Sequence, residues 1–312
     1  MSRRLVLVGN VIADLVIEIP ALPERGGDVV GSRTELTVGG GFNTLVAARR
    51  LGTAAVFAGP HGTGPHGDLV RAALAAEGVE NLLPVRIDGD TGFTVALVDG
   101  GGERTFVTSF GVEARLAEPE VAAVAAEIRP GDLVQLSGYA LALPAVGPLL
   151  ARLATGLPAG VTLCLDPASL VADIPPAVLD PVLARADWIS ANAREARLMT
   201  GHEDPAAAAA ALRARLAPGA GAVLRAGGAG CWLALPGAEP RHVPGFPVHA
   251  VDTNGAGDAH VGAFLARLAQ GETPAAAART ANAAAAYAVT RSGPATAPTS
   301  AELAEFLAGG GA

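Results

Sequence analysis

Short apolar segments alternate with segments of helical periodicity through the middle of this chain, and no other feature restricts its fold as strongly. The apolar segments suit buried strands and lie at 133–136, 161–165, 188–190 and 223–225. The helical segments lie at 119–128, 143–153, 194–200 and 205–216. Such alternation predicts an α/β fold, with a doubly wound, mostly parallel sheet flanked by helices.

The first third of the chain follows a different pattern. Two alternating segments, 93–98 and 104–109, are joined by Asp99-Gly100-Gly101-Gly102, which predicts a hairpin. We expect about residues 11–38 and 91–112 to form a small β-sheet that lies as a lid beside the main sheet. Since no internal repeat or linker divides the chain, residues 1–312 are expected to form a single domain.

Composition argues against several classes of protein. The formal net charge is −8 and no basic run occurs, which disfavours nucleic-acid binding. No uncharged apolar window of about 18 residues is present, so we expect no membrane partner. Cys164 and Cys231 are the only cysteines, which disfavours a disulfide scaffold and makes the cytoplasm the expected location.

The basic residues are all arginine, because the chain contains no lysine. A Walker A lysine, a protein-kinase lysine and a Schiff-base lysine are therefore excluded. Any phosphate chemistry must use backbone amides, arginine and a metal ion.

The segment Asp252-Thr253-Asn254-Gly255-Ala256-Gly257-Asp258 is the strongest sign of function. The apolar residues 247–251 before it suggest the end of a strand, and Val261, Phe264 and Leu265 after it follow a helical period. The first amides of a helix have no internal partner, so this turn predicts an anion site. Asp258 at its edge suggests a general base. The alternative is an ordinary turn in which the helix dipole alone favours the carboxylate.

Three further motifs occur in order along the chain: Gly39-Gly40-Gly41-Phe42-Asn43, Asn192-Ala193-Arg194-Glu195 and Gly227-Gly228-Ala229-Gly230. Together with residues 252–258, they resemble the signatures of the PfkB (ribokinase-like) family of carbohydrate and nucleoside kinases. The resemblance extends over roughly residues 5–307. It implies a ribokinase-like fold with ATP and Mg²⁺ as cofactors.

The resemblance also implies a role for individual residues. Asp258 would be the catalytic base, beside an anion hole formed by Gly255, Ala256 and Gly257. The sugar hydroxyls would be bound by Asp14, Gly39, Gly40 and Asn43. The nucleotide would be bound by Asn192, Glu195, Arg225, Gly227, Gly230 and Asn282, with Glu195 holding Mg²⁺ through water. A monovalent cation such as K⁺ would be bound by Asp252 and by the backbone of Asn254, Arg291 and Gly293.

Simpler explanations exist for several of these residues. Asn192 and Glu195 match a helix capping box, and Asn43 could cap the helix that follows it. Asp14 could be a turn residue, and Asn282 could be a polar residue tolerated in an Ala-rich helix.

We expect an ATP-dependent phosphotransferase that phosphorylates a hydroxyl of a small sugar, as ribokinase and fructokinase do. One alternative is a nucleoside kinase of the adenosine or pseudouridine type, which the low aromatic content of 4% weakly disfavours. Another is a sugar- or nucleotide-binding regulator without catalysis. A homodimer formed through the lid is also expected.

Overall fold

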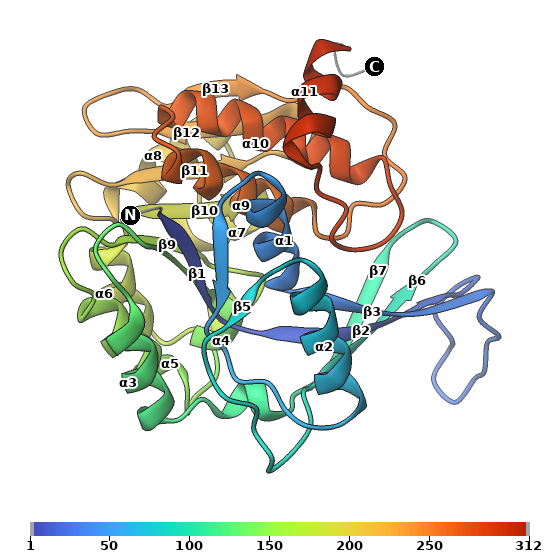
Figure 1. Cartoon of the computed structure of the whole chain (residues 1–312). Helices are drawn as coiled ribbons and strands as arrows, with labels where there is room; N and C mark the ends of the chain where they lie inside the picture. The colour runs from blue at the N-terminus through green and yellow to red at the C-terminus, as the bar shows by residue number, and fades with distance from the viewer. Residues whose placement is uncertain (1–2, 310–312) are drawn as a thin grey trace.

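The computed structural model describes residues 3–309 and has a nine-stranded sheet at its centre (Figure 1). Its strands are β1 (Arg4–Val8), β4 (Ala54–Phe57), β5 (Glu80–Asn81), β8 (Leu133–Ser137), β9 (Thr162–Asp166), β10 (Trp188–Asn192), β11 (Gly221–Arg225), β12 (Gly230–Ala234) and β13 (Arg241–Pro244). Their order is β13-β12-β11-β10-β9-β8-β1-β4-β5. Neighbouring strands are parallel from β5 to β11, and β12 and β13 are antiparallel. The predicted mostly parallel sheet is confirmed.

Helices cover both faces of this sheet, because its strands are apolar on both sides. On β1, Leu5 and Leu7 pack toward one layer, and Val6 and Val8 pack toward the other. The first layer contains α1 (Phe42–Arg50), α2 (Pro65–Ala76), α9 (Ala256–Ala269), α10 (Pro274–Val289) and α11 (Ser300–Ala308). The second contains α3 (Glu118–Glu127), α4 (Gly138–Leu141), α5 (Gly147–Thr155), α6 (Pro176–Arg185), α7 (Ala193–Thr200) and α8 (Pro205–Ala214).

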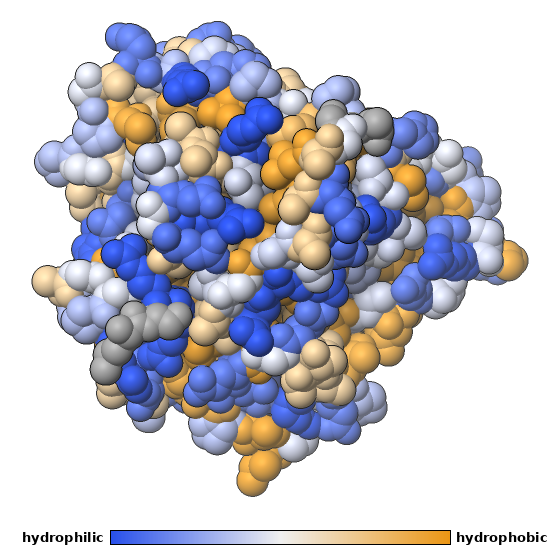
Figure 2. Space-filling model, turned by 45° about the horizontal axis from the view of Figure 1, so that its top comes forward, coloured by the Kyte–Doolittle hydropathy of each residue, from blue (hydrophilic) through white to orange (hydrophobic). Residues whose placement is uncertain are grey.

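A separate four-stranded sheet projects from the side of the main body (Figure 1, right). Its strands are β2 (Val11–Glu18), β3 (Arg33–Gly40), β6 (Phe93–Val98) and β7 (Arg104–Ser109), in the order β3-β2-β6-β7. The strand register aligns Asp14 with Thr37 and Thr94 on one face, where Asp14 and Thr94 are buried. Leu36 and Val107 lie on the opposite face and are exposed, and Figure 2 shows hydrophobic side chains on this projecting part. We call this sheet the lid.

The main differences from the sequence expectations concern two helices and one strand. The helices α6 and α11 were not expected. Pro175 at its N-cap, Pro176 at its first position and Pro181 inside it disguise α6, although proline is well tolerated at the start of a helix. The expected strand at 247–251 is absent: β13 ends at Pro244, and an extended loop leads to α9. Within residues 3–309, no helix combines the length and apolar character needed to cross a membrane.

Candidate active site

Asp258 lies in the first turn of α9, where this helix meets the start of α1. Gly255 caps this helix with a φ of 71°, a left-handed conformation that favours glycine. Asn43 Nδ2 and Thr44 Oγ1, from the start of α1, each donate a hydrogen bond of 3.4 Å to the Asp258 carboxylate. Burial, followed by the nearby charge of Asp166, raises the pKa of Asp258 to about 7. A carboxyl group with this pKa is poised to accept a proton near neutral pH.

The main-chain amides at the start of α9 lie beside Asp258, in the same helical turn. Helix geometry leaves the first-turn amides without intrahelical partners and gives this end a partial positive charge. Of the three residues predicted to form the anion hole, Ala256 already donates its amide to the Thr253 carbonyl, at 3.3 Å. A Cβ on Gly257 would meet the Arg225 guanidinium at about 3.6 Å, so this turn and that cation are in contact distance. The site therefore combines main-chain donors with a buried positive charge.

Arg225 is the centre of a buried charge cluster at the carboxyl ends of β9, β10 and β11. Its guanidinium donates to Asp166 Oδ2 at 2.9 Å, to Ser190 Oγ at 3.1 Å and to Glu195 Oε2 at 3.4 Å. Burial and the charge of Asp166 raise the pKa of Glu195, and Arg225 opposes this rise. Parallel strands end at the same edge of a sheet, which explains why residues distant in sequence meet here.

Asn192 and Glu195 form the capping box that the simpler explanation predicted. The Asn192 side chain accepts a bond of 2.8 Å from the Glu195 amide, and Glu195 Oε2 accepts one of 2.8 Å from the Asn192 amide. The same Glu195 carboxylate also faces Arg225, so capping does not remove it from the charge cluster. Within the described part of the chain, no group of three or more His, Cys, Asp or Glu side chains is arranged to hold a metal.

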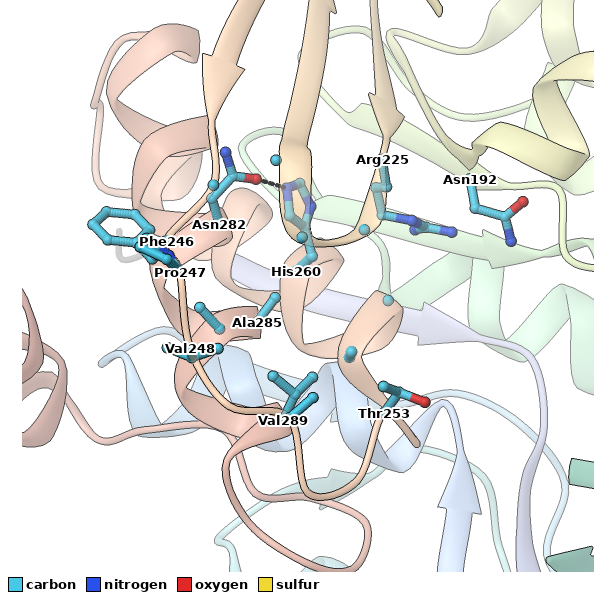
Figure 3. Close-up of a pocket in the computed structure, with 18 residues that line it drawn as sticks. Asn192, Arg225, Phe246, Pro247, Val248, Thr253, His260, Asn282, Ala285 and Val289 are labelled. Carbon is cyan, nitrogen blue, oxygen red and sulfur yellow. Dashed lines mark hydrogen bonds between the residues drawn. The ribbon is translucent and has the colours of Figure 1, made fainter. Parts of the chain in front are cut away.

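A cavity of about 430 Å³ opens beside the charge cluster (Figure 3). One wall is the loop that replaced the expected strand, with Phe246, Pro247 and Val248 facing the cavity. The loop at 227–230 adjoins this wall, and the Gly245 amide donates to the Ala229 carbonyl at 3.1 Å. Gly230 must be glycine, because a Cβ there would lie 2.3 Å from the Val243 carbonyl oxygen. A largely apolar cavity with a charged end has the character of a nucleotide pocket.

Asn282 lines this cavity, but its amide group is already occupied. Its Nδ2 donates to the carbonyls of Val243 and Pro244, at 3.0 and 3.1 Å, and its Oδ1 lies 3.1 Å from His260 Nε2 (Figure 3). Since the Asn282 oxygen can only accept, His260 must donate from Nε2. Burial lowers the pKa of His260 to about 3 and keeps it neutral. Asn282 therefore fixes the position of the end of β13, from which the cavity wall continues.

The residues predicted to bind a sugar lie on the lid side of Asp258. Asp14 is buried, and within residues 3–309 its carboxylate accepts no hydrogen bond from the protein. Burial raises the pKa of Asp14 to about 6. A Cβ on Gly39 would lie 1.9 Å from Asp14 Oδ2, so only glycine fits beside this carboxylate. Gly40 then leads into α1, which carries Asn43 to Asp258; Gly41, and not Asn43, is the cap of this helix.

The residues predicted to bind a monovalent cation are brought together in part. Asp252 Oδ1 accepts from the Asn254 amide at 2.7 Å, and Asp252 Oδ2 accepts from the Gly293 amide at 3.1 Å. Asp252 also pairs with Arg104 from the lid. The Arg291 side chain lies over the Tyr287 ring, 3.3 Å from its centroid, and its backbone was the predicted ligand.

Sequence reasoning missed the partners that hold these residues. Thr44 directly follows Asn43, and its place in the first turn of α1 was the available signal. No sequence signal connects Arg104 with Asp252, because they are 148 positions apart and meet only through the packing of the lid against the body. Tyr139 was not expected either. Its hydroxyl lies 3.0 Å from Ser169 Oγ. Burial, followed by the nearby charges of Asp258, Asp166 and Glu195, raises its pKa.

Comparison with known proteins places this geometry in context. Residues 2–301 match the family described as pfkB family carbohydrate kinase. An uncharacterized sugar kinase of Escherichia coli is 35% identical, over 96% of this chain and 93% of that protein. The ribokinase of Haemophilus influenzae is 30% identical, over 98% of this chain and 99% of that protein. The structure of Arabidopsis thaliana ribokinase, complexed with ribose and ATP, shares the fold with a TM-score of 0.78 at 24% identity, and 98% of this chain and 99% of that chain are covered.

Proposed function

Because the chain belongs to the pfkB family of carbohydrate kinases, we propose that it transfers the γ-phosphoryl group of ATP to a hydroxyl of a small sugar. One observation carries the proposal. The Asp258 carboxylate lies at the amino end of α9, between an apolar cavity with a charged end and the buried carboxylate of the lid. A general base, a nucleotide site and a polar acceptor site are thereby adjacent.

Asp258 is the proposed base. Its pKa of about 7 leaves a large fraction ionised at neutral pH, so it can accept the proton of the sugar hydroxyl as the phosphoryl group arrives. The amides of Gly255 and Gly257 would stabilise the negative charge on the transferred group, with Arg225 behind them. Phosphoryl transfer demands positioning and charge stabilisation, and these residues supply both.

The nucleotide would occupy the 430 Å³ cavity, with its base among Phe246, Val248 and the loop at 227–230. Its phosphates would extend toward Arg225 and the start of α9. Magnesium bound to these phosphates would lie near the Asn192–Glu195 pair, because carboxylate and amide oxygens are the ligands that Mg²⁺ prefers. When bound, Mg²⁺ neutralises charge on the phosphates.

A sugar is the preferred acceptor over a nucleoside. Among residues 3–309 no donor bonds the Asp14 carboxylate, so it can accept hydrogen bonds from sugar hydroxyls. Gly39 and Asn43 continue this polar surface toward Asp258. The similarity to ribokinase and to a sugar kinase favours the same substrate class.

We also propose a homodimer formed through the outer face of the lid. On this face, the side chains of Leu36, Leu15, Val95 and Val107 lie in one row across the four strands. Leu36 is 49% exposed and Val107 62% exposed. A contiguous apolar row of this kind is stabilised when a second copy covers it.

A substrate panel tests the proposal. Purified protein would be incubated with ATP, Mg²⁺ and each of a set of pentoses, hexoses and nucleosides, and the release of ADP and the mass of the product would be measured. We expect at least one sugar to gain one phosphoryl group. The Asp258→Asn variant, purified in the same way, controls for contaminating kinases. Tight ligand binding with no turnover on any compound would instead identify a non-catalytic regulator.

A further inference from the structure

We propose that the Arg104 guanidinium takes the place of a metal ion at Asp252. The Arg104–Asp252 pair holds the turn before the anion hole and makes the reaction independent of monovalent metal ions. This inference rests on the proposed kinase function. It departs from the K⁺ site that the family resemblance implied at Asp252, Asn254, Arg291 and Gly293. Arg104 is a positioning residue, since it acts on the turn that carries Gly255 and Gly257.

The position of Arg104 in the lid supports this role. Arg104 begins β7 and lies opposite Val98 of β6, on the face of the lid that is turned toward the main body. From there it donates a charge-assisted hydrogen bond to Asp252 Oδ1. The side chains are only 17% and 14% exposed, so water screens this pair weakly. The pair spans a small cavity of about 110 Å³ between the lid and the loops at 251–254 and 292–294.

The donor set around Asp252 does not suit a metal ion. Asp252 Oδ1 receives both the Arg104 guanidinium and the Asn254 amide, and Oδ2 receives the Gly293 amide. These three donors occupy three of the roughly four acceptor positions of the carboxylate, and the guanidinium already supplies the positive charge that a metal ion would bring. A monovalent ion at this carboxylate would also have to displace a cation that is covalently part of the chain.

The other charged groups at this cavity are already paired with each other. Arg33 of the lid lies 2.7 Å from Glu35 and 3.6 Å from Glu18. Arg104 is therefore the basic residue that reaches the loops of the main body, among those that line the cavity.

Asp252 transmits the position of Arg104 to the reaction centre. It lies three residues before Gly255, and its bonds to the Asn254 and Gly293 amides tie the turn to the loop after α10. A cation at this carboxylate fixes the direction in which the first amides of α9 point. Without one, the carboxylate charge would be only partly satisfied and the turn would be less ordered.

The first experiment compares salts. The phosphorylation rate of the unmodified protein would be measured in potassium chloride and in tetramethylammonium chloride at equal ionic strength, since the second cation is too large for a metal site. We expect rates that agree within about twofold. Arg104→Met should lower the rate about tenfold in tetramethylammonium, and potassium should restore part of it, because the freed Asp252 can then bind the ion. Arg33→Met, which removes the same charge from the same face of the lid, should behave as the unmodified protein does.

A second readout does not depend on catalysis. The melting temperature of the unmodified protein should be equal in the two salts, whereas Arg104→Met should be stabilised specifically by potassium. The double variant Arg104→Met, Asp252→Asn should lose this stabilisation. A rate or melting temperature of the unmodified protein that rises strongly with potassium would overturn the inference, as would an Arg104→Met variant with no response to potassium. Failure of the proposed function would appear differently, as absence of phosphorylation in both salts, and the melting data would still decide the role of Arg104.

Discussion

The two sheets of this protein differ in how far their faces are exposed to solvent. The central strands of the main sheet are covered on both faces, and Val134 of β8 is 0% exposed. The lid is covered on one face only, and Val107 of β7 is 62% exposed. A parallel sheet with helices on both sides is stable by itself, whereas a four-stranded sheet with one bare face depends on its contacts.

The residues of the candidate site also come from these two parts of the molecule. Asp258, Arg225 and Glu195 come from α9 and from the ends of packed parallel strands, which are the rigid parts of the fold. Asp14 and Arg104 come from the lid. In the proposed function, phosphate chemistry is therefore assigned to the main body and recognition of the sugar to the lid. Water excluded by a closed lid cannot compete as phosphoryl acceptor.

The largest effect is expected from Asp258→Asn on the fixed platform. An amide cannot accept the proton of the hydroxyl, so the turnover number should fall by about 10² to 10⁴-fold. Nucleotide affinity should be unchanged, because Asp258 is not among the residues that line the cavity, although Ala256 and Gly257 before it are. Steady-state kinetics and calorimetric titration with an ATP analogue would measure the two quantities. A near-native rate would remove Asp258 from the role of base.

The pH dependence of the unmodified enzyme tests the same assignment. Only the ionised carboxylate is a base, and burial raises the pKa of Asp258 to about 7. The value of kcat/KM should therefore decrease as pH falls below about 7, and the slope of the logarithm should approach one below that pH. An acid limb that begins near pH 4 would mean that an ordinary, exposed carboxylate is responsible.

Arg225→Met should cause the largest loss of stability. Removing the guanidinium leaves Asp166 and Glu195 buried together without a cation, and breaking such a cluster costs about 3 kcal/mol in the free energy of unfolding. Urea unfolding would measure it. Arg152→Met makes the same substitution in an exposed pair with Glu118 and should cost less than about 1 kcal/mol. Equal losses in the two variants would show that the buried cluster contributes no more to the free energy of unfolding than an exposed ion pair does.

On the lid, Asp14→Asn should weaken sugar binding and leave the nucleotide unaffected. Hydrogen bonds to a charged acceptor contribute about 1.5–3 kcal/mol, so the KM for the sugar should rise about thirtyfold. The KM for ATP should not change. Asp28→Asn, in an exposed part of the lid loop, is the matched control. A change in the KM for ATP of similar size would contradict the division of the site between lid and body.

The sequence predicted the main body well, because strand and helix periods are local properties. The buried strands at 133–136 and 223–225 were recognisable from their apolar runs, and Asp258 from its glycine turn. The failure at 247–251 has a physical reason. Pro247, Val248 and Ala250 line the 430 Å³ cavity, and hydrophobic periodicity cannot distinguish a cavity wall from burial in a sheet.

Long-range partners were beyond sequence reasoning for a different reason. Asn43 and Asp258 are 215 positions apart, and Arg104 and Asp252 are 148 apart. Their contacts follow from how α1 packs on α9 and how the lid meets the body, which no local pattern encodes. The Ala-rich helix α10 shows the same limit: Asn282 lines the cavity, and no local pattern indicates that its amide group contacts two backbone carbonyls and His260.

The smallest effect is expected from one substitution made in both sheets. Val134→Thr places a hydroxyl in the fully covered sheet, where it lacks a partner, and should cost about 1.5 kcal/mol in the free energy of unfolding. Val107→Thr makes the same change on the bare face of the lid and should stay within about 0.5 kcal/mol when the protein is dilute. Unfolding would be measured at several protein concentrations. If the proposed dimer covers this face, the cost at Val107 should rise with concentration while the cost at Val134 stays constant, because only the lid face would then be buried by association.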